Sequence, residues 1–182
     1  MIDQHADSDD RSLVDFLERF VASRQFQEVF EEGMRLVEET ADYLDGPGRQ
    51  AARELSRDDA IVYATESMRL TTRLMQMASW LLLQRAVANG EVSEQERLRE
   101  QESIGLAALA EEPEEETIAR LPVELAALAG RAQRLHEQIL RLDAIISARH
   151  QQSTPKRHPV SDMLARLRAE FSRGGKKDDS QG

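Results

Sequence analysis

The sequence contains no cysteine, which excludes disulfide bonds, thiol catalysis and cysteine-based zinc sites. Aromatic residues make up only 4% of the 182 positions, and there is a single Trp. Sheet proteins favour aromatic and β-branched residues, so an aliphatic composition rich in Ala and Met favours helices. A chain of this length is by default one domain, and it can bury a sizeable core.

Long hydrophobic runs are also missing. The most apolar stretch, residues 77–87, is far shorter than the roughly 20 residues that span a membrane. Residues 1–10 are polar and acidic, lack the features of a signal peptide, and are expected to be disordered. We therefore expect a soluble, cytoplasmic protein that does not insert into membranes.

Charge is distributed unevenly along the chain, whose formal net charge is −10. Residues 149–182 hold eight Lys or Arg against four Asp or Glu, so a basic tail follows an acidic body. An acidic body repels phosphates, which argues against nucleic-acid binding. The tail could contact an acidic surface on its own body or on a partner.

Capping residues and apolar spacing predict three long helices, at about 24–45, 57–88 and 122–148. Ser23 and Ser56 are candidate N-caps, and Pro122 suits a first helical turn. We expect an all-α, antiparallel three-helix bundle over residues 11–148, with short extra helices and an acidic linker at 104–120. The third long helix has the clearest heptad pattern, formed by Leu121, Leu125, Leu128, Ala132, Leu135, Ile139, Leu142 and Ile146.

The helix at 57–88 should be central, because its last three turns are apolar nearly all round. Projection at 100° per residue gives a predicted core face of Ala60, Ala64, Ser67, Thr71, Leu74, Met75, Ala78, Leu81 and Leu82. The opposite face carries Glu66, Arg69, Arg73 and Gln76, followed by Trp80, Leu83 and Val87.

Trp80, Leu83 and Val87 have two interpretations. Residues 12–20 or the linker of the same chain could cover them. Alternatively they form a homodimer contact, since an exposed apolar patch marks an interaction site. The homodimer contact is the interpretation we favour.

No catalytic, cofactor or metal site is predicted. His5, His136, His150 and His158 have no second ligand at the spacing of a metal motif, and His136 is expected on a solvated helix flank. The charges of Glu66, Arg69 and Arg73 are typical of an ion-pair network on a packed bundle, with a binding surface as the alternative. The network could extend to Glu38 or Glu39 on the first long helix.

The basic tail, residues 149–182, is expected to be flexible apart from one short amphipathic helix at 161–171. Flanking Pro and Gly residues place this helix on a tether, and tethered amphipathic helices commonly insert into a partner's groove. Docking on its own body is the alternative. The candidate partner-binding residues are Val160, Met163, Leu164, Leu167 and Phe171.

Two segments carry a family resemblance: LVEETADYLDGPGR at 36–49 and LSRDDAIVYATESMRLTTRLMQMASWLLLQRAVANGE at 55–91. They resemble the RcdA family, whose name stands for regulator of CtrA degradation. The resemblance continues more loosely through RLHEQILRLDAII at 134–146.

The resemblance implies a homodimeric three-helix bundle with a disordered C-terminal tail and no catalysis of its own. It implies an adaptor that delivers cargo such as CtrA to the ClpXP protease, after a CpdR-like protein has primed the unfoldase. A PopA-like adaptor that binds cyclic-di-GMP could be carried as well. The alternative hypothesis is a structural or scaffolding bundle without a role in proteolysis.

Overall fold

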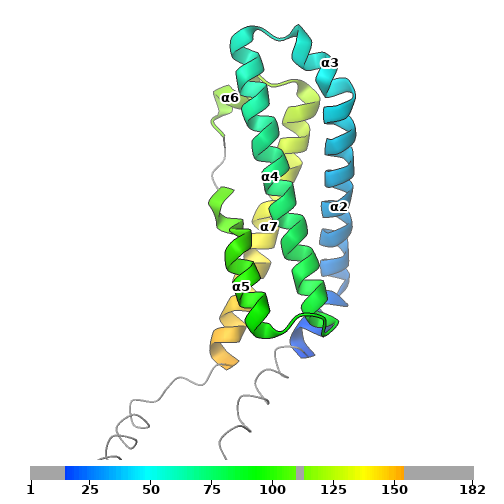
Figure 1. The fold of residues 1–182 in the computed structure, drawn as a ribbon, viewed down its shortest axis with the longest axis vertical. Coiled ribbons are helices and arrows are strands. Elements are labelled where there is room, and N and C mark those ends of the chain that lie inside the picture. The colour runs from blue at the N-terminus through cyan, green and yellow to red at the C-terminus, as the bar shows by residue number, and fades with distance from the viewer. Residues whose placement is uncertain (1–14, 110–112, 154–182) are drawn as a thin grey trace, which may run out of the picture.

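The fold is an all-α bundle in a computed structural model that describes residues 15–109 and 113–153 (Figure 1). The prediction of an all-α bundle is confirmed, and no strand occurs within these ranges. Three long helices form the body: α2 (Arg24–Asp45), α4 (Arg57–Ala88) and α7 (Val123–Ser153). The shorter elements are a helical segment at 15–21, α3 (Pro47–Glu54), α5 (Glu94–Ile104), the 3-10 helix η1 (Leu106–Leu109) and α6 (Glu115–Ala119).

The long helices do not simply alternate in direction. Helix α2 runs antiparallel to both α4 and α7, whereas α4 and α7 run parallel to each other (Figure 1). The reason is the connection after α4, in which α5, η1 and α6 climb back along the bundle before α7 begins. Two hydrogen bonds show that α4 and α7 share a direction. Arg120, just before α7, donates to Asp59 near the start of α4, and Trp80 in the second half of α4 donates to Asp143 in the second half of α7.

Local sequence signals set the helix boundaries. The hydroxyl of Ser23 accepts a hydrogen bond from the backbone N–H of Phe26, and that of Ser56 caps α4 in the same way. The chain leaves α2 at Gly46, and Pro47 occupies the first turn of α3. Ser93 and Glu96 form a reciprocal capping box at the start of α5. The side chains and the backbone therefore specify the same boundaries.

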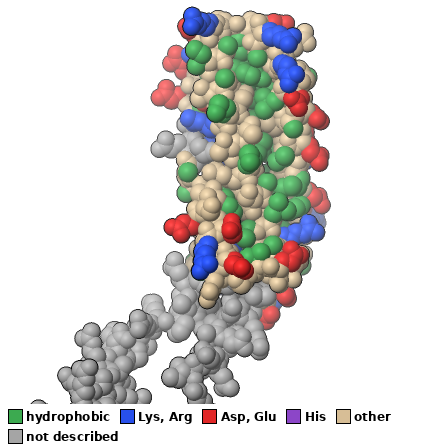
Figure 2. Space-filling view, viewed as in Figure 1, with side chains coloured by type: hydrophobic (Ala, Val, Ile, Leu, Met, Phe, Trp, Pro, Cys, Tyr) green, Lys and Arg blue, Asp and Glu red, His purple; other side chains and the backbone are tan. Residues whose placement is uncertain are grey.

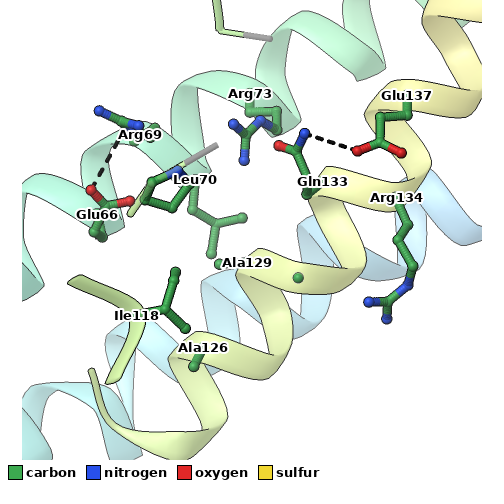
Figure 3. Close-up of a pocket in the computed structure, with 12 residues that line it drawn as sticks. Glu66, Arg69, Leu70, Arg73, Ile118, Ala126, Ala129, Gln133, Arg134 and Glu137 are labelled. Atoms are coloured by element: carbon green, nitrogen blue, oxygen red, sulfur yellow. Dashed lines mark hydrogen bonds and ion pairs between the residues drawn. The ribbon is translucent and has the colours of Figure 1, made fainter. Parts of the chain in front are cut away.

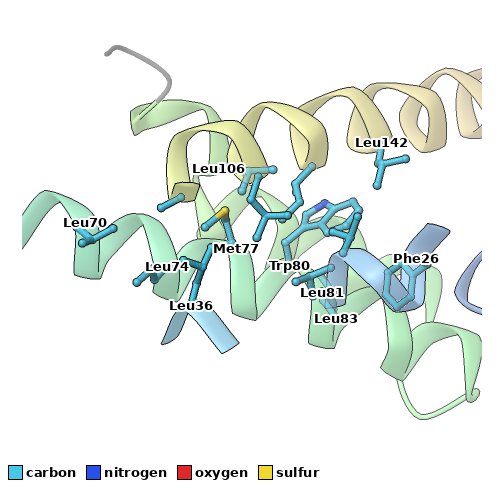
Figure 4. Packing of buried hydrophobic residues seen from close by; sticks show 14 of the residues in the cluster. Phe26, Leu36, Leu70, Leu74, Met77, Trp80, Leu81, Leu83, Leu106 and Leu142 are labelled. Carbon is cyan, nitrogen blue, oxygen red and sulfur yellow. The ribbon is translucent and has the colours of Figure 1, made fainter. Parts of the chain in front are cut away.

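The core lies between the three long helices and continues under the connection (Figure 4). Helix α2 approaches α4 closely at Gly33, where an added Cβ would lie 3.0 Å from Cδ1 of Leu81. All eight residues of the predicted heptad pattern are buried, seven of them in α7 and Leu121 just before it. Fully buried side chains from the three helices include Phe26, Leu36, Leu70, Met77, Leu81, Leu125 and Ile139.

The predicted core face of α4 is wrong in its orientation. Thr71, Met75 and Leu82 were expected in the core, yet all three are exposed. Conversely, Glu66 and Arg73 were expected on the polar face, yet they are only 6% and 2% exposed. The cause is that α4 packs against α2, α7, α5 and η1 together, so its buried arc is wide and includes polar side chains.

A part-buried polar node ties α4, α5 and α7 together. The indole Nε1 of Trp80 in α4 donates to the carboxylate of Asp143 in α7 over 2.7 Å. The amide Nε2 of Gln101 in α5 donates to the same carboxylate oxygen over 2.6 Å. A buried indole N–H needs an acceptor, so this node fixes how α5 lies across α4 and α7.

Adjacent leucines of α4 provide a matched test of the helix orientation. Leu81→Ala should lower the free energy of unfolding by about 2–5 kcal/mol, because it opens a cavity in the core. Leu82→Ala should cost the monomeric chain less than about 1 kcal/mol, because Leu82 is 52% exposed within one chain. Urea unfolding followed by circular dichroism measures both. Equal losses for the two variants would contradict the orientation of α4.

Candidate functional site

The candidate site is the solvent-exposed face of α4, which carries no charge over six turns. We call this face the α4 seam. Charged residues make up 32% of the sequence, so nine exposed positions in a row without one is a marked departure. Depletion of charge and enrichment of Met are the compositional signal of a protein–protein interface. The seam comprises all the exposed residues from 61 to 82: Ile61, Ala64, Thr65, Met68, Thr71, Thr72, Met75, Ser79 and Leu82.

Four large apolar side chains of the seam follow a heptad spacing. Ile61 is 61% exposed, Met68 72%, Met75 66% and Leu82 52%. Figure 2 shows hydrophobic side chains along the face of the molecule on which α4 lies. A spacing of seven residues places these side chains on one narrow line, the pattern that a helix presents to another helix. The seam is therefore shaped for packing against a helix.

Three threonines make the seam more apolar than its sequence suggests. The hydroxyls of Thr65, Thr71 and Thr72 donate to backbone carbonyls four residues earlier, over 2.8–2.9 Å. Because the hydroxyl hydrogens are used within the helix, the methyl groups are left for contact with a partner. Between the four large side chains, the seam therefore presents small side chains that are largely apolar.

Trp80, Leu83 and Val87 do not belong to the α4 seam. The expectation that they form an exposed patch is wrong. All three are buried within one chain. Trp80 is held by a hydrogen bond to Asp143 of α7, to which Gln101 of α5 also donates. These side chains therefore cannot contact a second copy unless the bundle opens.

His136 is also corrected, because it is fully buried and not solvated. Its Nε2 lies 2.7 Å from the carbonyl oxygen of Leu106 in η1. Burial lowers the pKa of His136 below its ordinary value. The hydrogen bond to Leu106 opposes this effect, whereas the positive charge of Arg73 reinforces it. The imidazole is consequently a neutral support for η1.

The charged residues form two separate groups. Glu66 pairs with Arg69 within α4, at 3.7 Å between Oε1 and Nε. Glu39 pairs with Arg131 of α7, which also bonds Glu32 over 3.0 Å. The ion pair of Glu39 therefore joins α2 to α7, and among the described residues neither Glu66 nor Arg69 is paired with it. The pairs that Arg131 makes are partly exposed, and each contributes little to stability.

Within residues 15–109 and 113–153, no group of three His, Asp or Glu side chains is placed to hold a metal ion. No helix in the described part of the chain is long and apolar enough to cross a membrane. The tail residues Val160, Met163, Leu164, Leu167 and Phe171 lie outside the described residues, so their role stays a prediction.

The fold and the site define a class of protein: an all-α bundle with one long, uncharged helix face. Residues 17–171 match the family DUF1465, which is described as a protein of unknown function. The solved structure of RcdA from Caulobacter crescentus CB15 has 47% sequence identity and a TM-score of 0.54, covering 71% of this chain and 96% of that chain. The chain therefore belongs to the RcdA family. No curated protein matches the sequence.

The burial of His136 predicts a pH-dependent stability. Below its ordinary pKa of 6.5, the unfolded chain binds a proton that the folded chain resists. Stability should therefore fall as pH drops below 6.5, by up to about 1.4 kcal/mol per pH unit from this group.

Urea unfolding at pH 7.5, 6.5 and 5.5 measures the effect, with His136→Gln as the variant that cannot titrate. The stability difference between the native chain and the variant should shrink as pH falls. A difference that stays constant across the three pH values would contradict a neutral, buried His136.

Proposed function

We propose that the chain is a non-enzymatic adaptor that delivers regulatory proteins to the ClpXP protease. The observation that carries the proposal is the 47% identity to RcdA across 96% of that chain. Delivery requires surfaces for other proteins, and the α4 seam is a surface of that kind. The alternative of a purely structural bundle has no observation that favours it.

The mechanism is tethering. One surface of the adaptor holds the cargo while another engages the protease that a CpdR-like protein has primed. The second encounter then becomes intramolecular, and its effective concentration rises to about the millimolar range for a short tether. Cargo such as CtrA, and a PopA-like adaptor, belong to the same proposal.

We also propose that the α4 seam is the homodimer contact, in place of Trp80, Leu83 and Val87. A two-fold axis between Thr71 and Thr72 would pair two copies of α4 in an antiparallel arrangement. Ile61 would then face Leu82 of the partner subunit, and Met68 would face Met75 of the partner subunit. The contact is self-complementary because each apolar residue meets an apolar residue, as an isologous interface requires. Its length, from 61 to 82, is about 32 Å.

Delivery is tested by reconstituted degradation of a CtrA-like cargo with ClpXP and the priming protein. Adding this chain should accelerate degradation severalfold, and Leu164→Asp combined with Leu167→Asp should slow it without changing the circular dichroism spectrum. The control pair Ser180→Asp and Gln181→Asp adds the same charge outside the apolar stripe. If the native chain does not accelerate degradation, the adaptor function is refuted. If the double variant is as active as the native chain, only the role of the tail in delivery is refuted.

The antiparallel pairing is tested by cysteine cross-linking, which the absence of native cysteine makes clean. Met68→Cys mixed with Met75→Cys should give a disulfide-linked dimer under mild oxidation, because facing positions come within bonding range. Each variant alone should not, because identical positions lie about 10 Å apart along the axis. Strong cross-linking of Met68→Cys by itself would rule out the proposed register.

A further inference from the structure

An apolar groove lies between α7 and the connection that α5 and η1 form. Its volume is about 420 Å³. Of the residues that line it, Leu106 is buried, Leu98 is 43% exposed, and Ala107 and Ala108 are exposed. Leu140 of α7, which is half-buried, completes the apolar lining. We call this surface the α5–α7 groove.

Two hydrogen bonds show how far the groove extends along α7. Gln101 donates to Asp143 at one level, and His136 bonds the carbonyl oxygen of Leu106 at another. The two residues of α7 are about 10 Å apart along the helix axis. Because Leu98 precedes Gln101 by nearly one turn, the groove extends about 15 Å from Leu98 to η1.

The helix predicted in the basic tail carries an apolar stripe of similar length. Its residues lie outside the described part of the chain, and the helix is an expectation from the sequence. Over the twelve positions from Val160 to Phe171, a helix rises about 16 Å. The stripe therefore matches the groove in length and in apolar character.

The end of α7 places the tail beside this groove. Helix α7 ends at Ser153, which lies about 15 Å along the axis from Asp143. Residues 154–159 follow, and from Ser153 to Val160 an extended chain spans up to about 25 Å. Val160 can therefore fold back to the end of the groove near Leu98.

The same reach fixes the direction of the tail helix in the groove. The other end of the groove is level with His136, about 26 Å along the axis from Ser153 even before any sideways displacement. Val160 cannot reach that end. The tail helix can consequently enter the groove in only one direction, antiparallel to α7, with Val160 near Leu98 and Phe171 near η1.

Charge favours the same contact. Among the described residues that line the groove, Glu102 and Asp143 are acidic and none is Lys or Arg. Asp143 accepts hydrogen bonds from an indole and an amide, which carry no charge. Residues 154–177 hold seven Lys or Arg against two Asp or Glu. The basic tail is therefore attracted to the acidic groove over roughly the 10 Å range of unscreened charge.

Two other concavities are less suited to the tail. The concavity between α4 and α7 beneath α6 is lined by arginine as well as glutamate side chains (Figure 3). Its nearest residue of α7, Glu137, is about 24 Å along the axis from Ser153, at the limit of the reach. The second lies between α4 and α5, and it includes Ser79 and Leu82 of the α4 seam. To reach it from α7, the tail would have to cross α5.

We propose that the α5–α7 groove is the docking site of the chain's own tail helix. The apolar stripe packs against Leu98, Leu140 and η1, and the basic residues around it lie near Glu102 and Asp143. While the helix is docked its stripe is hidden, so a partner of the tail has to displace it from the groove. The partner's apparent affinity is then reduced by the fraction of chains whose tail is free. The inference goes beyond the proposed function and does not require it, because the contact is made within one chain.

The test is disulfide formation within the full chain, which has no native cysteine. Leu98→Cys with Val160→Cys, and Ala107→Cys with Phe171→Cys, place one cysteine at each matching end of groove and stripe. Under mild oxidation both pairs should close a disulfide within one chain, seen as a shifted monomer band on a non-reducing gel.

The swapped pairs are the matched control. Leu98→Cys with Phe171→Cys, and Ala107→Cys with Val160→Cys, use the same four substitutions but hold the cysteines about 16 Å apart in the docked state. The matched pairs should react at least tenfold faster than the swapped pairs. Equal rates would overturn the proposal, because an undocked tail samples all four pairings. Disulfide-linked dimers as the main product would also overturn it, because a second copy would then supply the tail.

Substitutions in the stripe provide an independent check. In the chain that carries Leu98→Cys and Val160→Cys, adding Leu164→Asp and Leu167→Asp should slow the reaction at least tenfold. The control pair Ser180→Asp and Gln181→Asp should leave the rate within twofold. An unchanged rate in the stripe variant, at an unaltered melting temperature, would refute docking by the stripe. No protease is present in this assay, so its outcome is separate from that of the delivery assay.

Discussion

The position of α4 inside the bundle is the constraint on which the rest of the structure depends. Helices α2 and α7 pack on it from two sides, and α5 with η1 covers a third. Helix α4 therefore packs against most of the other elements, and only a narrow strip of it is left in solvent. This strip has no charge, so the helix that organises the core also provides the surface most suited to a protein partner.

The polar groups buried along α4 specify its rotation. An apolar helix buried on several sides could pack in more than one orientation at similar cost, because hydrophobic contact is not directional. Hydrogen bonds are directional, and the link from Trp80 through Asp143 to Gln101 is made in only one orientation. The hydrogen bond between the buried His136 and the carbonyl of Leu106 fixes the position of η1 in the same way. These groups give the bundle its uniqueness more than its stability.

The sequence was sufficient for the parts of the fold that follow from local chemistry. Ser23, Ser56 and the Ser93–Glu96 box are caps by virtue of their own side chains, and the heptad pattern of α7 has a single apolar face. The same reasoning failed for α4, because a helix that is apolar nearly all round has no unique core face. Glu66 and Arg73 then misled the projection, since a charge is assumed to face solvent.

The candidate site was missed for a related reason. Because Met75 and Leu82 are apolar, the helical projection places them in the core and places Trp80 on the opposite face, as a dimer contact. The heptad line from Ile61 to Leu82 was present in the sequence. Only the knowledge that α5 and η1 cover the other side of α4 could separate it from the core pattern, and that knowledge is tertiary.

The climbing connection between α4 and α7 has a mechanical consequence. Because α7 runs downward like α4, residues 15–21 and the end of α7 lie at the same pole of the bundle (Figure 1). Phe16 and Arg149 are in contact there, with the guanidinium carbon 4.6 Å from the ring centre. A force that pulls residues 15–21 away from the end of α7 would separate α2 from α7 one turn at a time. It would not slide whole helices past one another. The opposite pole, at α3, would open last.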